Sequence, residues 1–350
     1  MMSIVVDARY RSETGVGRYI SGLCPELEEH GRLQYTFLRH DRARTSLRLP
    51  TRPLTVADQL GLALALRRLR PRLFHSPHFL VPVLWRGPVV VSIHDLIPLE
   101  YPESVGSVAA RHLYPALLGH ACARSLRILV PSNATREAIL QHGLARSDRI
   151  VVIPYGPPLL AQSDPVEPDV AKPILYVGDL KPHKNVLTLL RAFSGLSARV
   201  REEAPLFIVG DGPERDLLGQ ASDSFGVASH VRFLGHVSDG CLSTLYTAAR
   251  IVVVPSLAEG FGFPAVEAMA RGVPVVISDI AALRETTGGA SLTFDPRDSE
   301  ALGQRLIRLI EDDDLRTELV TRGRKRAGAF SWQLTARLTE AAYESALSDA

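Results

Sequence analysis

The sequence predicts an α/β protein built from two doubly wound, parallel-sheet domains of the Rossmann type. Short runs of apolar, mostly β-branched residues recur along the 350 residues. Most of these runs lack polar–apolar alternation, which is typical of strands buried on both faces of a parallel sheet. Helical stretches separate the runs, as in βαβ units. A proline-rich segment divides the chain into two similar halves, and a chain of this length suits two domains.

Strands and helices are expected to alternate through both halves. The expected strands span residues 4–6, 89–93, 128–130, 150–153, 174–177, 206–209, 231–234, 251–254 and 274–277. The expected helices span residues 17–30, 135–142, 186–193, 239–248, 299–311 and 332–347. In a fold of this class, ligands bind at the carboxyl ends of the strands.

The division of the chain follows from its prolines. Six of them fall within residues 154–173, and proline continues neither a helix nor a central strand. We therefore expect a linker at 157–172 between an N-terminal domain, 1–156, and a C-terminal domain, 173–330. Residues 331–350 carry a last helix, which the sequence allows to pack back on the N-terminal domain. The two sheets are expected to face each other across a cleft.

The composition excludes several classes of protein. Hydrophobic residues make up 46% and charged residues 22%, which excludes collagen-like and disordered chains. A formal charge of +2 argues against a nucleic-acid partner. Three distant cysteines form neither a disulfide framework nor a metal knuckle. No signal peptide is recognisable, and the longest apolar stretch, 60–66, is far short of the ~20 residues of a spanning helix. We expect a cytoplasmic protein.

The charge is unevenly distributed. Residues 39–72 contain nine arginines but only two acidic residues, Asp41 and Asp58. Such a region could bring the protein to the anionic inner face of a membrane or to a phosphorylated acceptor. The alternative is a solvated arginine-rich face, which composition alone favours.

A candidate phosphate loop follows the expected strand 174–177. The chain has four lysines, and two of them, Lys181 and Lys184, fall within residues 178–185. A loop that leaves a buried strand and enters a helix brings backbone N–H groups and the positive helix end to one point, where lysines suit a phosphate. The alternative is a polar helix start with Asn185 as its cap.

A second constellation follows the expected strand 251–254. Glu259 and Glu267 flank the glycines Gly260 and Gly262 and lead into a helix. The glycines let the backbone approach a ligand closely, and the carboxylates suit the vicinal hydroxyls of a ribose or hexose. The alternatives are a solvated loop acid for Glu259 and a first-turn acid that complements the helix dipole for Glu267.

Two further candidates lie in the first half. His94 comes at the end of the expected strand 89–93, where it could position a sugar hydroxyl or exchange a proton; a buried structural histidine is the alternative. His75 and His78 are weaker candidates of the same kind. Gly15 and Gly17 form a possible phosphate turn, but Ile20 replaces the last glycine of the dinucleotide fingerprint, which argues against a nicotinamide dehydrogenase.

No metal-ligand cluster is recognisable, so we expect no metal and no cofactor. Residues 312–314 are three aspartates, but they lie away from any strand end, and a solvated charge run is the simpler interpretation. The nucleophile elbow, the Walker loop and the zinc-protease motif are absent from the sequence.

Taken together, the motifs resemble retaining glycosyltransferase family 4, and most of all bacterial mannosyltransferases of surface-polysaccharide assembly. The tracts that carry the resemblance are DAR at 7–9, GVGRY at 15–19, HDLIPL at 94–99, GDLKPHKN at 178–185, VGDGP at 209–213, VRFLGHVS at 231–238, PSLAEGFGFPAVEAM at 255–269 and GVPVV at 272–276. They span nearly the entire chain. The resemblance implies a GT-B fold, in which the C-terminal domain holds most of a nucleotide sugar.

The resemblance also implies roles for single residues. Glu267 would hold the ribose hydroxyls and Glu259 the donor hexose. Lys184, with Lys181, would bind the diphosphate, and His94 would lie near the transferred sugar. Backbone amides of Gly260, Phe261, Gly262 and Phe263 would contact the sugar and phosphate, and the turn of Gly15 and Gly17 would close over the diphosphate. The base would lie near the turn that ends at Val237. One position departs from the pattern, because Asp179 stands where many relatives have arginine.

The expected function is transfer of a hexose from a nucleotide diphosphate to a sugar or lipid-linked acceptor, with GDP-mannose as the expected donor. A nucleotide-sugar 2-epimerase of the same fold and a non-catalytic sugar-nucleotide-binding protein are the alternatives. The sequence does not name the acceptor, the linkage or the oligomeric state.

Overall fold

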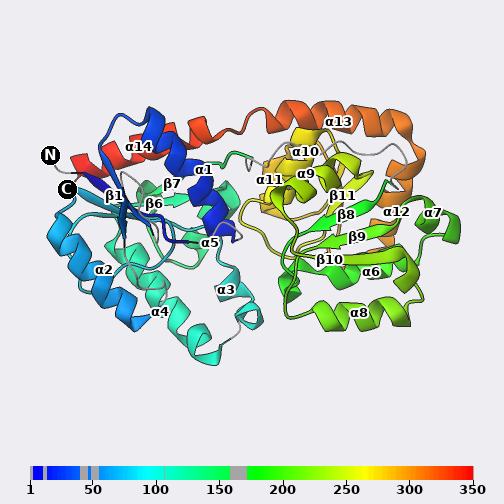
Figure 1. The fold of residues 1–350 in the computed structure, drawn as a ribbon, viewed down its shortest axis with the longest axis horizontal. Coiled ribbons are helices and arrows are strands. Elements are labelled where there is room, and N and C mark those ends of the chain that lie inside the picture. Colours follow the sequence, from blue (N-terminus) through cyan, green and yellow to red (C-terminus); the bar gives the residue numbers. More distant parts are fainter. Residues whose placement is uncertain are drawn as a thin grey trace. The chain divides into compact units, whose positions relative to one another are not determined.

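The computed structural model describes residues 3–10, 14–39, 46–48, 55–105, 107–157 and 172–349. The chain forms two compact units (Figure 1), which we call unit 1, residues 1–156 with 330–350, and unit 2, residues 157–329. The expected linker lies outside the described residues except for Pro157 and Lys172.

Unit 1 contains a seven-stranded sheet in which all neighbouring strands are parallel, in the order β3-β2-β1-β4-β5-β6-β7. Its strands are β1 (Ile4–Asp7), β2 (Tyr35–Arg39), β3 (Ser46–Arg48), β4 (Leu73–Ser76), β5 (Val89–Ser92), β6 (Arg127–Val130) and β7 (Ile150–Val152). The strand order reverses between β1 and β4, so the loops that follow these two strands mark the switch point at which Rossmann-type sheets bind ligands.

Helices cover the unit 1 sheet, with α1 and α14 along one side and α2 and α4 along the other (Figure 1). The helices are α1 (Gly15–His30), α2 (Val56–Leu69), α3 (Ile97–Glu100), α4 (Val108–Arg124), α5 (Asn133–Gln141) and α14 (Trp332–Ser348), with 3-10 turns η1 (Pro102–Ser104) and η2 (Ser147–Arg149). A Ser or Thr hydroxyl caps the N-terminus of α1, α2, α4, α5 and α14, which satisfies a backbone N–H group and fixes where each helix begins.

Unit 2 contains a six-stranded parallel sheet in the order β10-β9-β8-β11-β12-β13. Its strands are β8 (Ile174–Val177), β9 (Leu206–Val209), β10 (Val231–Gly235), β11 (Ile251–Val254), β12 (Val275–Ser278) and β13 (Leu292–Phe294). Its helices are α6 (Val186–Ser194), α7 (Ala198–Glu203), α8 (Arg215–Ser224), α9 (Asp239–Ala248), α10 (Phe263–Arg271), α11 (Ala281–Thr287), α12 (Ser299–Glu311) and α13 (Asp313–Ala327), with η3 (Pro182–Lys184) and η4 (Ala228–His230). The strand order reverses between β8 and β11, so this is the switch point of unit 2.

Glycines allow the loops at the carboxyl edge of unit 2 to touch. A Cβ atom on Gly210 would lie 2.0 Å from the carbonyl oxygen of Gly178, and one on Gly212 would lie 2.5 Å from that of Leu180. Any side chain at these positions would push the loops after β8 and β9 apart. The glycines therefore set the spacing at the strand ends.

The structure confirms the α/β fold class but adds elements that the sequence analysis missed. Strands β2, β3, β4 and β13 were not expected. Two of them are only three residues long, and β4 contains the polar but fully buried His75 and Ser76. Helix α1 begins at Gly15 and not at residue 17, because the Thr14 hydroxyl accepts a hydrogen bond from Gly17 N. Gly15 and Gly17 therefore both lie in the first turn of the helix, so the glycines open the helix as the sequence indicated.

Candidate active site

The main candidate site lies at the switch point of unit 2. The loop after β8 carries Lys181 and Lys184, and the loop after β11 carries Glu259. Lys184 Nζ donates a hydrogen bond to Glu259 Oε1 over 2.7 Å, and the two side chains are 19% and 10% exposed. A cation and a carboxylate that are both largely buried hold each other in place. Two residues that the sequence analysis assigned to different parts of one ligand thus lie in direct contact.

Ser256 is a further member of this site, and the sequence analysis missed it. Its hydroxyl is buried and donates to Glu259 Oε1 over 2.8 Å. Both hydrogen bonds that the described residues give to this carboxylate end on Oε1, so Oε2 can accept from a ligand hydroxyl. It could not be identified from the sequence, because a serine three residues before a glutamate is not a recognisable motif.

The second lysine of the loop has a different partner. Lys181 Nζ lies 3.0 Å from Asp179 Oδ2, and both side chains are substantially exposed. The aspartate that departs from the family pattern therefore pairs with a lysine of its own loop. An exposed pair of this kind contributes little to stability, so the ammonium group can turn toward an anionic ligand at small cost.

The glycine tract ends at the N-terminus of α10. Gly262 takes a left-handed backbone conformation with φ of 86°, and a Cβ atom there would lie 2.4 Å from a Leu283 side-chain carbon. The Phe261 carbonyl accepts a hydrogen bond from Thr286 Oγ1 over 2.7 Å, and the Phe261 and Phe263 rings meet edge to face. These contacts fix the backbone that leads into α10.

Glu267 lies deeper than the sequence analysis assumed. It is the fifth residue of α10, no acidic residue lies in the first turn of that helix, and the Glu267 side chain is fully buried. A first-turn acid that complements the helix dipole is therefore the wrong interpretation. The role of Glu267 in ligand binding stays a prediction.

Strand β10 forms one edge of the unit 2 sheet and leads into the turn at Val237. Val237 is partly buried there. The Arg215 guanidinium lies 3.9 Å from the centre of the Phe233 ring, a cation–π contact. Burial raises the pKa of nearby Glu214. Phe233 lies on β10, the strand that leads into the turn where the family resemblance places the nucleotide base.

In unit 1, His94 is bound through both ring nitrogens. Nε2 lies 2.7 Å from the carbonyl oxygen of Pro77, and Nδ1 lies 2.8 Å from the Tyr155 hydroxyl. Because a carbonyl oxygen only accepts, Nε2 carries the proton and Nδ1 accepts from Tyr155. Burial lowers the pKa of His94 to about 4, so the ring is neutral near pH 7. Proton exchange with a substrate requires one of these two hydrogen bonds to open.

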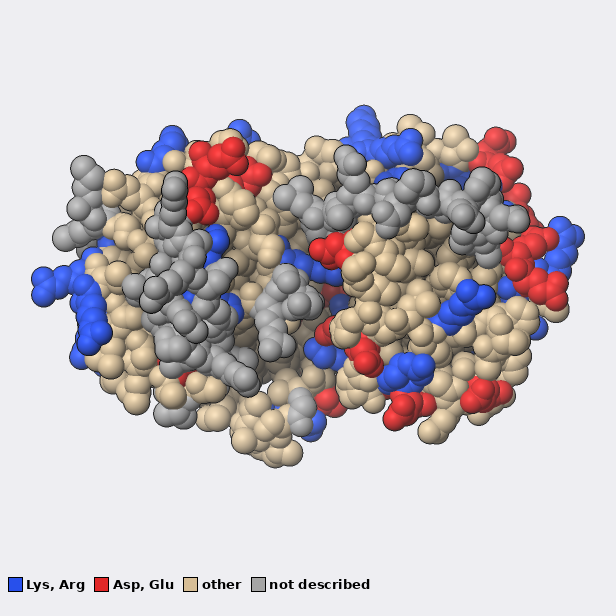
Figure 2. Space-filling view, in the orientation of Figure 1, with Lys and Arg blue, Asp and Glu red and all other residues tan. Residues whose placement is uncertain are grey.

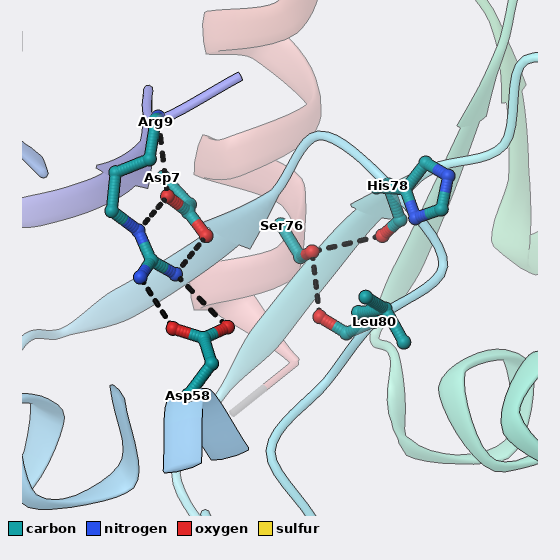
Figure 3. Close-up of polar contacts among 6 residues, drawn as sticks. All are labelled: Asp7, Arg9, Asp58, Ser76, His78 and Leu80. Carbon is teal, nitrogen blue, oxygen red and sulfur yellow. Dashed lines mark hydrogen bonds and ion pairs between the residues drawn. The ribbon is translucent and has the colours of Figure 1, made fainter. Parts of the chain in front are cut away.

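The two weaker histidine candidates differ from each other. His75 is fully buried and bonds the Tyr343 hydroxyl through Nδ1 at 2.6 Å and Ser92 Oγ through Nε2 at 2.9 Å. This is the environment of a structural histidine. The loop of His78 is fixed by Ser76 Oγ, which donates to the carbonyl oxygens of His78 and Leu80 at 2.8 Å each (Figure 3).

A buried charge cluster supports the loop after β1. The Arg9 guanidinium lies between Asp7 and Asp58, with Nε 2.7 Å from Asp7 Oδ1 and Nη1 2.5 Å from Asp58 Oδ1 (Figure 3). The Arg9 side chain is fully buried. Two carboxylates hold one guanidinium at the strand end, which anchors the chain just before the segment that leads to Gly15 and Gly17. The roles of those glycines in ligand binding stay predictions.

Among the described residues, no group of three or more His, Cys, Asp or Glu side chains is placed to hold a metal ion. The described helices also include none that is long and apolar enough to cross a membrane.

Comparison with known proteins places this chain in a family. Residues 14–157 match the family model described as Glycosyltransferase Family 4, and residues 162–326 match the model described as Glycosyl transferases group 1. The O-antigen chain mannosyltransferase B of Escherichia coli is 34% identical over 298 residues, which cover 81% of this chain and 76% of that protein. The chain belongs to glycosyltransferase family 4. It is therefore an enzyme that transfers a glycosyl group, as the sequence motifs predicted.

Other similar proteins extend the comparison. A phosphatidyl-myo-inositol mannosyltransferase of Mycolicibacterium smegmatis is 30% identical over 265 residues, or 74% of this chain and 65% of that protein. Among solved structures, sucrose-phosphate synthase from Thermosynechococcus elongatus has a TM-score of 0.81 at 20% identity and covers 100% of both chains. Anabaena HepE in complex with UDP-glucose has a TM-score of 0.78 at 19% identity and covers 98% of this chain and 100% of that one. These structures confirm the GT-B fold.

Proposed function

We propose that this glycosyltransferase transfers mannose from GDP-mannose to a hydroxyl group of a glycan or lipid-linked acceptor, with retention of the anomeric configuration. The Lys184–Glu259 pair carries the proposal, because it places a cation suited to a diphosphate beside a carboxylate suited to sugar hydroxyls. The choice of mannose rests on the relatives, whose names describe an O-antigen chain mannosyltransferase and a phosphatidyl-myo-inositol mannosyltransferase.

In this proposal, unit 2 holds the donor. Glu267 accepts from the ribose hydroxyls, and Glu259 accepts from a mannose hydroxyl through Oε2 while Oε1 stays on Lys184. Lys184 and Lys181 contact the diphosphate. The backbone from Gly260 to Phe263 contacts sugar and phosphate, and the turn at Val237 contacts the base. For unit 1, the family resemblance assigns His94 to the transferred sugar and Gly15 and Gly17 to the phosphates.

The chemical step is a substitution at C1 of the mannose. The bond between C1 and the diphosphate oxygen breaks, and its electron pair stays on the leaving diphosphate. The acceptor oxygen bonds C1 on the same face, and its proton passes to an oxygen of the leaving phosphate. Lys184 and Lys181 stabilise the negative charge that develops on that group. This route requires no metal or cofactor from the protein.

Binding and product analysis test the proposal. Thermal shifts should be larger with GDP-mannose than with UDP-glucose or ADP-glucose, because a tighter ligand stabilises the folded state more. With a hydroxyl acceptor, NMR should show an α-mannosyl product from the α-configured donor. A β product would refute retention. Formation of a 2-epimer without acceptor, or binding without turnover against a panel of acceptors, would overturn transfer in favour of the alternatives.

We also propose that unit 1 contacts an anionic membrane surface through α2 and the residues that follow it. On this helix, Leu60 and Leu64 are 50% and 56% exposed, and Arg67 and Arg68 one turn later are exposed too. Basic side chains gather over this end of unit 1 (Figure 2). Other arginines of the 39–72 region, including Arg42, Arg44 and Arg52, lie outside the described residues. Apolar and basic side chains on one helix suit an interface of anionic lipid.

Vesicle sedimentation tests the membrane proposal. Binding should rise with the phosphatidylglycerol content of the vesicles and fall with added salt. A Leu60→Ser, Leu64→Ser variant should bind more weakly, whereas Leu217→Ser, at an exposed leucine of unit 2, should bind normally. Binding that ignores lipid charge and salt would leave the region as a solvated face.

A further inference from the structure

Asn185, the residue after Lys184, adopts an unusual backbone conformation. Its φ is 57° and its ψ is 35°, in the left-handed region. Glycine adopts this conformation without steric cost, whereas asparagine is merely tolerated there. The contacts of the side chain must therefore explain why asparagine, and not glycine, occupies this position. Although Asn185 occupies the position before α6, its side chain makes no capping hydrogen bond, so the interpretation as a helix cap is wrong.

The Asn185 side chain instead joins three loops at the carboxyl edge of unit 2. Its Nδ2 donates to the carbonyl oxygen of Pro255 over 2.9 Å and to that of Pro296 over 2.8 Å. Its Oδ1 accepts from Thr188 Oγ1 over 2.7 Å. Pro255 directly follows β11, and Pro296 follows β13. Both amide hydrogens are thus used between loops, and the acceptor is used within α6.

These hydrogen bonds enclose the Lys184–Glu259 pair. On one side of Lys184, the His183 carbonyl accepts from Leu257 N over 2.7 Å. On its other side, Asn185 holds Pro255. The two loops are therefore tied at the residues that flank Lys184 and at the residues that flank Ser256, and Lys184 and Ser256 both donate to Glu259 Oε1. Of the two ties, only that of Asn185 depends on a side chain.

We propose that Asn185 is a positioning residue, which holds Lys184 at the place where it meets both Glu259 and the diphosphate of the donor. The inference rests on the proposed function, since it assumes that Lys184 binds phosphate. Asn185 itself touches no substrate. Without its amide donors, the loop after β8 loses its bonds to Pro255 and Pro296. The backbone bond from Leu257 N to the His183 carbonyl then remains beside the Lys184–Glu259 contact itself, and the lysine is held less firmly at its distance from the carboxylate.

Two variants separate the side chain from the backbone. Asn185→Gly keeps the left-handed backbone and removes both donors. Asn185→Asp keeps the size of the side chain but sets a carboxylate oxygen against two carbonyl oxygens. Two controls accompany them. Thr188→Val removes only the bond to Oδ1, and Arg70→Gly places glycine at the other described non-glycine residue with a left-handed backbone, φ 46°.

The experiment measures binding of GDP and of inorganic pyrophosphate by calorimetry, alongside melting temperatures. We expect Asn185→Gly to weaken both ligands about tenfold, and Asn185→Asp to weaken them more, with both controls within twofold of wild type. In a Lys184→Ala background, Asn185→Gly should change affinity less than twofold, because a residue that acts through Lys184 loses its effect once Lys184 is gone.

Failure of this inference and failure of the proposed function give different results. If Lys184→Ala binds both ligands as tightly as wild type, the proposed function is wrong at this site. If Lys184→Ala binds weakly but Asn185→Gly lowers only the melting temperature, or lowers affinity equally in both backgrounds, Asn185 is merely structural and the inference is overturned.

Discussion

Glu267 shows what a single buried charge predicts. It is fully buried on α10, and hydrogen bonds to a charged group contribute about 1.5–3 kcal/mol. We expect Glu267→Gln, which keeps the shape of the side chain, to weaken GDP binding tenfold or more in calorimetry. The control is Glu300→Gln, an exposed acid in the first turn of α12, which should bind normally. Unchanged GDP affinity in a folded Glu267 variant would remove this residue from the donor site.

Lys181 and Asp179 allow a test of the position where the chain departs from its family pattern. They pair with each other and are both exposed, so substitution should leave stability nearly unchanged. We expect Lys181→Ala to weaken donor binding about tenfold, because a phosphate contact is lost. Asp179→Ala should be neutral or mildly favourable, since it removes a carboxylate from beside the diphosphate and releases Lys181. Loss of activity in Asp179→Ala with no change in Lys181→Ala would refute this assignment.

Among the elements, α14 lies in a part of the fold that its position in the sequence does not indicate. It follows the last helix of unit 2 but packs on unit 1. Its Trp332 ring fills the space where a Cβ atom of Gly22 on α1 would stand, at 2.0 Å, and Thr335 Oγ1 donates to the Pro154 carbonyl over 2.8 Å. Glu340 Oε1 accepts from Arg32 N at 2.8 Å, Leu33 N at 3.2 Å and the Tyr35 hydroxyl at 2.6 Å. Helix α14 therefore packs on unit 1, although most of unit 1 comes from the other end of the sequence.

These contacts predict that Glu340→Ala destabilises unit 1 by about 3 kcal/mol, because two backbone N–H groups and the Tyr35 hydroxyl lose the acceptor that the buried Glu340 carboxylate provides. Urea unfolding measures the change. Glu344→Ala is the matched control, since Glu344 lies one turn later and its carboxylate forms an exposed ion pair with Arg32 over 3.4 Å. This substitution should cost less than about 1 kcal/mol. Equal effects of the two substitutions would contradict the assignment.

At the scale of the whole molecule, buried neutral histidines predict how stability depends on pH. Burial lowers the pKa of His75 to about 3, whereas an unfolded chain has a histidine pKa of about 6.5. Between these values only the unfolded chain binds the proton, so the free energy of unfolding falls as the pH falls from about 6.5 toward 3.

Each buried neutral histidine lowers the free energy of unfolding by about 1.4 kcal/mol when the pH falls from 7.5 to 5.5. Urea unfolding of the wild type and of His75→Gln at these two pH values checks this. The difference between the two pH values should be about 1.4 kcal/mol smaller in the variant. An identical difference would mean that the pKa of His75 is the same in the native and the unfolded protein, so that burial does not lower it.

The whole catalytic cycle should also run without a divalent ion, because Lys184 and Lys181 serve the diphosphate in the proposed reaction. Turnover measured in excess EDTA should equal turnover in buffer alone. Loss of turnover in EDTA that Mg²⁺ or Mn²⁺ restores would contradict this.

The sequence by itself determined the fold class, the two halves and the family. Runs of β-branched residues and the helices between them are local patterns, and the motifs at residues 178–185 and 255–269 are contiguous in the chain. These features can be recognised without a structure, because each depends only on residues that are close together in the sequence. The candidate site residues Lys184, Glu259 and Glu267 could be named from the sequence for the same reason, since each lies in or beside a motif at a strand end.

Only the tertiary structure decided which of these residues meet. Lys184 and Glu259 lie 75 positions apart, and Tyr343 and His75 lie 268 apart. The bonds of Asn185 to Pro255 and Pro296 and the support of Glu259 by Ser256 likewise join separate loops. Strand order sets these contacts, because it makes β8 and β11 neighbours although two strands separate them in the sequence. Local periodicity specifies that a strand forms, but the packing of the whole sheet specifies beside which strand it lies.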